Sequence, residues 1–394
     1  MTPQSQDSPT GRYVVTVVGG EEVRAFVPAP LPPNPPLGMD GPLVMALDKA
    51  SRSLGRFDGA VRRLPDPALL IYSYVRKEAV LSSQIEGTQS SLTDLMRHEL
   101  GAAPGVPLDD VLEVSRYVAA LDHALARMAD PAGLRLCNRL LREAHRILLT
   151  GARGGDKRPG EFRTSQNWIG GRRPGTAVFV PPPAPEAHEA ISELEKFLHV
   201  DDDHLPPLVR AGLAHVQFET IHPFLDGNGR IGRMLITLML MARGVLATPA
   251  LYLSLYLKQH RSRYYDLLGR VRTEGDWTAW LLFFLEGIHA TAVAALSTTE
   301  RLEDLVERDR ATIRARAGRA TGSALLVHGA LARTPILNVR EGMKRTDLSK
   351  PAVQDALRRL GEFRIAREVT GQRRNRLFAY TEYLDILSEG TEPL

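Results

Sequence analysis

Apolar residues recur at intervals of three and four over most of this sequence, which is the spacing of one face of an α-helix. The clearest stripe comprises Val111, Val114, Val118, Leu121, Leu125 and Met128. Similar patterns cover residues 43–57, 134–149, 186–199, 206–220, 229–243, 258–272 and 276–296. The chain is therefore predicted to be mainly α-helical.

Two segments interrupt this helical pattern. Residues 26–42 contain seven prolines, which cannot continue a helix or a central strand, so an extended arm is predicted there. Residues 166–181, QNWIGGRRPGTAVFVP, predict two short strands around a turn. The edge of such a hairpin could accept an extended partner segment by main-chain pairing, or the hairpin could be a plain surface loop.

The composition excludes several classes of protein. The single cysteine, Cys137, rules out an intramolecular disulfide and a cysteine-based zinc site. No unbroken apolar run approaches the roughly 18 residues of a membrane-spanning helix. The N-terminus lacks the basic start and apolar core of a signal peptide. A cytoplasmic protein without membrane contact is expected.

The pattern changes after about residue 300. Residues 311–380 hold 15 basic and 5 acidic residues, a local charge of +10. The predicted elements are helices at 300–318, 323–332, 338–345 and 349–360, followed by strands at 365–369 and 377–380. The last helices and strands have the order of a winged helix-turn-helix, with 349–360 as recognition helix and Arg373, Arg374 and Arg376 on the wing. Winged helices bind DNA or dock proteins, so both contacts stay open.

Residues 221–233, IHPFLDGNGRIGR, carry the most chemical information. Gly227 and Gly229 let the backbone turn tightly, and the apolar run that follows opens a helix. Free N–H groups at a helix N-terminus, together with the helix dipole, form an anion site. Arg230 and Arg233 lie three apart on that helix and can hold further phosphate oxygens.

Two other side chains of this segment suit phosphate chemistry. Asp226 is a hard oxygen ligand beside the anion site, which favours Mg²⁺. His222 stands at the loop entrance and can act as a general base near neutral pH. The GxGxxG match at 227–232 does not indicate a dinucleotide site, because a helix precedes it and no acidic residue follows at the required distance.

The segment from His222 to Arg233 resembles the signature of Fic-domain proteins, HxFx[DE]GNGRxxR, at every specified position. The segments LPPNPPL, KEAVLSSQIEGTQSSL, RSRYYDLL and TEGDW extend the resemblance over about residues 25–380. It implies a Fic-type helical bundle with a small β-hairpin flap and a C-terminal winged helix-turn-helix domain. The implied divisions are a flexible N-terminus (1–25), a helical region with an inhibitory helix (26–130), a catalytic core (131–298) and the winged domain (299–394).

The resemblance further implies transfer of AMP from ATP to a Ser, Thr or Tyr hydroxyl of a target protein, with Mg²⁺ as cofactor. His222 would take the hydroxyl proton and Asp226 would hold the metal. The nucleotide would be bound by Phe224, Gly227, Asn228, Gly229, Arg230 and Arg233. Tyr264 and Tyr265 would line the adenosine pocket unless they only pack between helices. The target, or the chain itself, would dock on the hairpin at 166–181.

A second segment, SSQIEG at 82–87, resembles the inhibitory motif [ST]xxxE[GN] of the same family. Ser82 and Glu86 are four apart, so they share one face of a helix. By this resemblance Glu86 would pair with Arg233 and occupy the guanidinium that the γ-phosphate needs. The alternative is that this segment is an ordinary surface helix whose glutamate has no inhibitory role.

Two other functions remain open at this stage. The same loop could move other phosphate-linked groups, or remove AMP from a modified protein with Glu86 taking part in the reaction. Alternatively, the chain could be a DNA-binding regulator whose nucleotide pocket is a sensor. The sequence is compatible with a homodimer but does not specify one.

Overall fold

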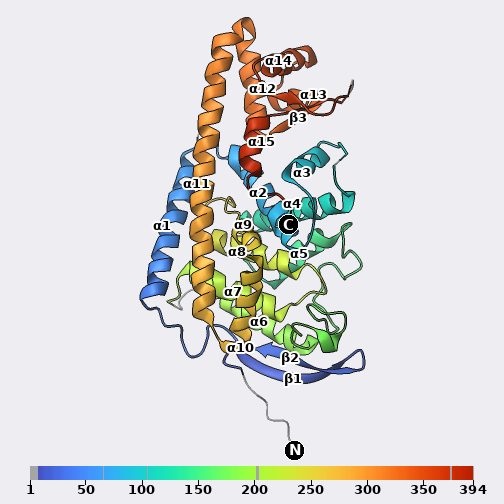
Figure 1. Cartoon of the computed structure of the whole chain (residues 1–394), viewed down its shortest axis with the longest axis vertical. Helices are drawn as coiled ribbons and strands as arrows, with labels where there is room; N and C mark the ends of the chain where they lie inside the picture. Colours follow the sequence, from blue (N-terminus) through green and yellow to red (C-terminus); the bar gives the residue numbers. More distant parts are fainter. Residues whose placement is uncertain (1–7, 65, 104, 201–203, 373–374, 394) are drawn as a thin grey trace, which may run out of the picture. The chain divides into compact units, whose positions relative to one another are not determined.

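The computed structural model describes residues 8–64, 66–103, 105–200, 204–372 and 375–393 (Figure 1). Helices dominate, and the strands form one two-stranded and one three-stranded sheet, both antiparallel. The predicted mainly helical class is confirmed. The chain divides into two compact units, each of which is described by itself. The first comprises Met1–Gly55, Ser115–Pro249 and Tyr256–Ala290, and the second Arg56–Val114, Ala250–Leu255 and Thr291–Leu394.

Helices make up most of the first unit. Its complete elements are β1 (Gly11–Val18), β2 (Glu21–Pro28), α5 (Asn138–Leu149), the 3₁₀ turn η1 (Pro174–Thr176), α6 (Ala184–His199), α7 (Pro207–Ile221), α8 (Asn228–Ala242) and α10 (Arg261–Glu274). Parts of α1 (Gly41–Arg63), α4 (Leu108–Ala129), α9 (Ser254–Gln259) and α11 (Trp277–Arg316) also belong to it. α7 packs against α6, α8 and α10. It is buried from Leu208 to Ile221, which is the pattern of a core helix.

β1 and β2 form an N-terminal hairpin that runs from Gly11 opposite Pro28 to Val18 opposite Glu21. Its two-residue turn is Gly19-Gly20, and both glycines have positive φ, as such a turn requires. The prediction of a flexible N-terminus over 1–25 is therefore wrong from Gly11 onward. The overlooked signal was a Gly-Gly pair between a run rich in β-branched residues and a second run that contains Val23, Phe26 and Val27.

The hairpin predicted at 166–181 is reduced to one bridge between Ile169 and Phe179, and η1 occupies the turn. The two strands expected there are therefore wrong. The segment is instead held by the N-terminal hairpin, because the Phe26 N–H donates to the Val180 carbonyl at 3.0 Å. A pairing partner more than 150 residues away explains why the local sequence alone did not predict this arrangement.

The second unit contains the C-terminal part of the chain. Its complete elements are α2 (Ala68–Ile85), α3 (Leu92–Glu99), η2 (Gly318–Ala320), α12 (Thr321–Arg333), β3 (Ile336–Asn338), α13 (Val339–Thr346), α14 (Lys350–Glu362), β4 (Arg367–Glu368), β5 (Leu377–Ala379) and α15 (Thr381–Ser388). The charged helix predicted at 300–318 is not separate but is the end of α11. β3 and α15 were not predicted.

The tail has a three-stranded sheet in the order β3-β5-β4, with α12, α13 and α14 beside it. Its designation as a winged helix-turn-helix stays a prediction. Arg376 is exposed just before β5, whereas Arg373 and Arg374 lie outside the described residues. α11 is long and apolar enough to cross a membrane by length and composition, but 56% of its most apolar window is buried, as in a core helix of a globular protein.

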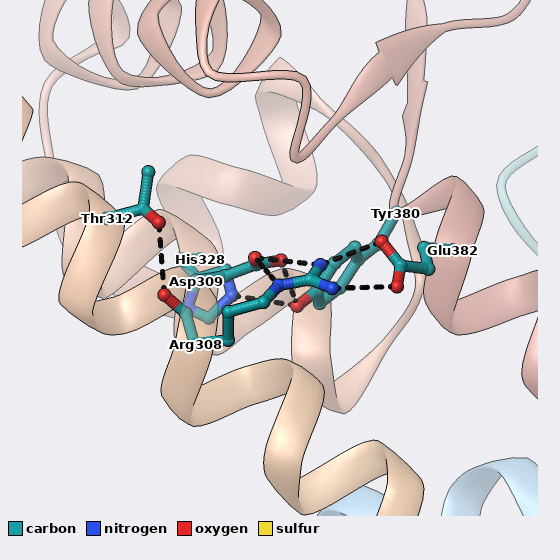
Figure 2. A network of polar contacts seen from close by, with 6 residues as sticks. All are labelled: Arg308, Asp309, Thr312, His328, Tyr380 and Glu382. Carbon is teal, nitrogen blue, oxygen red and sulfur yellow. Dashed lines mark hydrogen bonds and ion pairs between the residues drawn. The ribbon is translucent and has the colours of Figure 1, made fainter.

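A buried polar network joins α11 to the end of the tail (Figure 2). The Tyr380 hydroxyl donates to Asp309 Oδ2 at 2.7 Å, and His328 Nε2 lies 3.2 Å from the same hydroxyl oxygen. Because that hydroxyl has a single proton, His328 must donate through Nε2. Burial lowers the pKa of His328 to about 4 and raises that of Tyr380, so both side chains are neutral near pH 7.

Candidate active site

α7 and α8 are joined by the loop that the sequence predicts as an anion site. His222 caps α7 in the left-handed region, with φ 49° and ψ 59°, and Gly227 caps α8 with φ 75°. Such a backbone is routine for glycine but unusual for histidine, so the surrounding structure must hold His222 in place. His222 is partly exposed, as a base that meets a substrate must be.

Asn228 fixes the shape of this loop. Its side-chain Oδ1 accepts a hydrogen bond from the Phe224 N–H at 2.8 Å, and its Nδ2 donates to the Phe224 carbonyl at 2.9 Å. Asn228 is 2% exposed, and both ends of its amide bond to one residue. The side chain therefore holds the loop closed, while the main chain of 227–229 forms the first turn of α8.

Arg163 holds the main chain at His222 in place. Its backbone N–H donates to the Pro223 carbonyl and its Nε donates to the His222 carbonyl, each at 2.9 Å. The remaining guanidinium donors bond to the carbonyls of Ser165, Pro182 and Ile221. Arg163 is fully buried, and burial lowers its pKa to about 10, so it remains a cation at neutral pH. A positive charge at the carbonyl end of α7 also suits the helix dipole.

His145 of α5 supports the other half of the loop. Its Nδ1 accepts the Gly160 N–H at 2.8 Å, so its Nε2 carries the proton and donates to the Asp226 carbonyl at 3.0 Å. The ring stacks on Phe224, with centroids 3.7 Å apart and planes 8° apart. Burial lowers the pKa of His145 to about 4, which keeps this donor–acceptor pattern intact near neutral pH.

Asp226 presents its carboxylate at the loop surface, with 40% of the side chain exposed. Its Oδ1 accepts the Gly227 N–H at 2.6 Å and lies 3.7 Å from an Arg230 guanidinium nitrogen. Gly154 approaches the other oxygen so closely that a Cβ there would stand 2.5 Å from Oδ2. The chain around Gly154 therefore forms one wall beside this carboxylate.

Arg230 and Arg233 begin α8 and are 3% and 2% exposed. α7 approaches this helix so closely that a Cβ on Gly232 would lie 2.2 Å from Glu219 Oε1. Arginine stays charged when buried, so two positive charges lie within the first two turns of a helix that already presents its positive end. This combination can hold the phosphates of a nucleotide.

The two predicted adenosine-pocket tyrosines differ in position. Tyr264 is 1% exposed, and its hydroxyl donates to His215 Nε2 at 2.8 Å, while His215 Nδ1 donates to the Gly232 carbonyl at 2.9 Å. Trp280 packs beside both rings. Tyr264 thus has the packing role that the sequence left as the alternative. Tyr265 is 41% exposed and remains a candidate for nucleotide contact.

The predicted inhibitory residues lie in the second unit. Ser82 is buried within α2, and Glu86 is the exposed C-cap residue of that helix. Gly87 follows with φ 104°, a conformation that ends the helix and favours glycine. Arg233 belongs to the first unit, so its pairing with Glu86 stays a prediction.

The buried histidines make stability depend on pH. His145 and His215 have pKa values lowered by burial to about 4, against about 6.5 in an unfolded chain. As the pH falls from 6.5 toward 4, these histidines bind protons in the unfolded state but stay neutral in the folded state. The unfolding free energy therefore decreases by up to about 3 kcal/mol per histidine. Urea unfolding at pH 7.5, 6 and 5 measures this.

His215→Gln is the matched variant for that measurement, because it removes one titrating group and retains polar contacts in its place. Its unfolding free energy should fall less between pH 7.5 and 5 than that of the parent chain. An unfolding free energy of the parent that is flat over this range would contradict the assignment of neutral buried histidines.

Sequence reasoning missed three residues that shape the site, namely His145, Arg163 and Gly154. Each lies more than 50 residues before its partner in the loop, and none belongs to a local motif. No cluster of three or more His, Cys, Asp or Glu side chains that could hold a metal by itself occurs within the described ranges. A cation here would depend on Asp226 together with phosphate oxygens.

Comparison with known proteins gives consistent results. Residues 44–126 match the family described as "Fic/DOC family N-terminal", and residues 135–240 match the "Fic/DOC family". A curated "Protein adenylyltransferase Fic" from Culex quinquefasciatus is 31% identical over 265 residues, which is 65% of this chain and 48% of that protein. The protein of the same name from Aedes aegypti is 31% identical over 224 residues, 55% of this chain and 41% of that protein. This chain thus spans about half the length of these relatives or less.

Solved structures are similar in fold. A Fic family protein from Desulfovibrio desulfuricans G20 has a TM-score of 0.57 at 21% identity and covers 88% of this chain and 97% of its own. Fic-1 (residues 134–508) from C. elegans has a TM-score of 0.51 at 23% identity and covers 66% of this chain and 75% of its own. At these identities the likeness establishes a shared fold.

Proposed function

This chain carries both regions of the Fic/DOC family, and from that premise we propose that it is a protein adenylyltransferase that moves AMP from ATP to a hydroxyl of a protein. One observation carries the proposal. A partly exposed histidine at the end of α7 and a phosphate cradle at the start of α8 lie at the two ends of one braced loop. That is the arrangement that a base-assisted attack on a bound phosphate needs.

The proposed reaction assigns a role to each of these residues. An imidazole nitrogen of His222 takes the proton of a Ser, Thr or Tyr hydroxyl, whose oxygen bonds to the α-phosphorus of ATP. The bond from that phosphorus to the bridging oxygen breaks, and pyrophosphate leaves. The backbone of 227–229 and the Arg230 side chain bind the α- and β-phosphates, and Arg233 binds the γ-phosphate. The main chain of Phe224 bonds to the Asn228 side chain and so supports the loop. The site contributes mainly positioning and charge.

Asp226 fits the role of a magnesium ligand. Its carboxylate is exposed beside the phosphate cradle, and Mg²⁺ is usually bound by one or two carboxylates together with phosphate oxygens. The ion would neutralise phosphate charge during the transfer. The chain's own contribution is to hold the Asp226 carboxylate in place through the Gly227 N–H and through the His145 hydrogen bond to its carbonyl.

The segment 166–181 is proposed to position the target hydroxyl. Its first half is tied to the catalytic loop, because Asn167 Nδ2 donates to the Phe224 carbonyl at 3.1 Å. Trp168 and Val178 on this segment are 39% and 85% exposed, so they can contact a protein surface. A target segment, or a segment of another copy of the chain, would meet these side chains next to His222.

We also propose that Glu86 restrains the enzyme. Support comes from its exposed position at the end of α2 and from its match to the family's inhibitory pattern. Its carboxylate would form a bidentate pair with the Arg233 guanidinium and so compete with the γ-phosphate for the same donors. ATP would then bind with its phosphates misaligned for attack.

Glu86→Gly is expected to raise AMP transfer more than tenfold, equivalent to more than about 1.4 kcal/mol of barrier. The physical reason is that Arg233 becomes available to the γ-phosphate. Mass spectrometry of the variant incubated with ATP and Mg²⁺, alone and with cell extract, should show a covalent AMP adduct. Glu86→Gln is the matched variant, since it retains size but loses charge and should release the enzyme only in part.

If Glu86→Gly transfers AMP at the same rate as the parent chain, the proposed inhibition by Glu86 is contradicted. The proposed transferase activity is not affected by that result. Loss of AMP from a previously modified protein, dependent on Glu86, would instead favour the reverse reaction. No adduct in either variant would contradict the adenylyltransferase assignment itself.

A further inference from the structure

The second unit contains a cleft of about 1000 Å³ that is separate from the residues of the proposed active site. One wall is the end of α3 and the small residues Gly101, Ala102 and Ala103. The opposite wall comes from the starts of α13 and α14 and from described residues on either side of 373–374, namely Val369, Thr370, Gln372, Asn375, Arg376 and Leu377. Small residues on one side leave room for a ligand, and the other side supplies the polar groups.

Four cations line this cleft, Arg97, Arg340, Lys350 and Arg376. None of its described lining residues is acidic or aromatic. Within the described parts of the chain, none of the four forms an ion pair with a carboxylate. Other arginines on the helices of Arg340 and Lys350 do form ion pairs. Arg345 pairs with Glu341 on α13, and Arg358 pairs with Asp355 on α14. Glu368 interacts electrostatically with Arg376, so the positive charge of the cleft comes mainly from the other three cations.

Arg97 adds an unsatisfied donor to this charge. One of its terminal nitrogens donates to the Val369 carbonyl at 3.3 Å, which ties α3 to the tail. Its Nε is buried and has no hydrogen-bond partner in the described structure. An unpaired buried donor of a charged group destabilises a fold, and an anionic oxygen in the cleft would bind this guanidinium through its accessible terminal nitrogens.

The helix starts and the carboxamides define the ligand further. Asn338 caps α13 through its Oδ1, and Lys350 is the first residue of α14, so two helix dipoles add positive potential at the cleft. Gln354, Gln372 and Asn375 also line it. Side-chain amides both donate and accept, which suits the edges of base pairs, while the cations suit phosphates.

We propose that this cleft binds the phosphodiester backbone of double-stranded DNA, with the start of α14 toward a groove. The lack of aromatic side chains on the described lining argues against a single strand, which proteins hold by stacking its bases. The carboxamides on α14 and on the turn after β4 argue against a plain acidic peptide, which needs only cations. This inference stands apart from AMP transfer, because it concerns different residues and a different ligand.

Fluorescence anisotropy with a labelled 20-base-pair duplex tests the proposal on the full chain. If four phosphates are neutralised, the logarithm of the association constant should fall with the logarithm of salt concentration with a slope of about −3.6. Affinity should then drop about 10²-fold between 50 and 200 mM salt. Arg340→Ala/Lys350→Ala removes two cleft cations and should reduce the slope by about two.

The matched control is Arg345→Ala/Arg358→Ala, which removes the same charge from the same two helices outside the cleft. It should bind nearly as the parent chain does. No binding at 50 mM salt, or equal losses in both double variants, would overturn the proposal. Tighter binding of the single strand, or displacement of the duplex by polyglutamate at equal charge, would overturn the choice of ligand. Binding does not depend on AMP transfer, so failure here leaves the enzymatic proposal untouched.

Discussion

His222→Ala is expected to abolish AMP transfer in the Glu86→Gly background, with a loss of at least 10²- to 10⁴-fold. The attacking hydroxyl would lose the group that we propose as its base, and general-base catalysis typically contributes that factor. ATP binding should persist, because the proposed phosphate contacts are made by α8 and not by the His222 ring. Transfer of label from α-labelled ATP measures the rate, and the shift of melting temperature with added ATP measures binding.

The left-handed backbone at position 222 complicates an alanine there, since alanine adopts φ near 49° less readily than asparagine does. His222→Asn is therefore the matched variant, because it tolerates that backbone and still lacks a base. Both variants should be inactive, and His222→Asn should melt at a temperature closer to that of the parent chain. A His222→Asn protein that transfers AMP at the parental rate would contradict the role of the imidazole.

Arg163→Met is expected to lower both the stability and the turnover number. The substitution leaves the carbonyls at the end of α7 without their charged donor, at a cost of more than about 3 kcal/mol. The His222 ring would lose its fixed position, so kcat should fall at least 10²-fold while KM for ATP, set by α8, changes much less. Steady-state kinetics on the folded fraction separates the two effects.

Two variants accompany this measurement. Arg163→Lys retains the charge but not the planar set of five donors, so it should recover only part of kcat. Arg158→Met changes an exposed arginine of the same segment, which bonds to Thr164 Oγ1, and should leave kcat unchanged. If Arg163→Met lowers kcat/KM only by raising the KM for ATP, with kcat unchanged, then Arg163 acts on nucleotide binding and not on His222.

Local patterns predicted several helices and the loop between α7 and α8 well. α7, α8 and α14 begin and end within two residues of the predicted bounds, because apolar spacing and helix-ending residues are short-range signals. The residues of the loop are contiguous, so one motif contains the base, the carboxylate and the phosphate cradle. The charged end of α11 was predicted as a new helix, yet no glycine or proline interrupts it between Ile288 and Ala317.

Long-range contacts account for what the sequence did not predict. His145 reaches Asp226 across 81 positions, and Arg163 reaches His222 across 59. A histidine in an amphipathic helix and an arginine in a loop have many ordinary uses, so neither is distinctive before the chain is folded. Tyr264 was predicted either to line the nucleotide pocket or to pack between helices, and its burial against His215 favours packing.

The contact between β2 and Val180 restricts how a substrate protein can approach. Phe179 pairs with Ile169 on one side, and Val180 accepts the Phe26 N–H on the other, so residues 179 and 180 already have main-chain partners on both sides. Because successive main-chain groups of a strand point to alternate sides, the outer edge that remains is at Trp168 and Gly170. If the proposed target adds by backbone pairing, it would enter along that edge, which would set the direction from which its hydroxyl reaches His222.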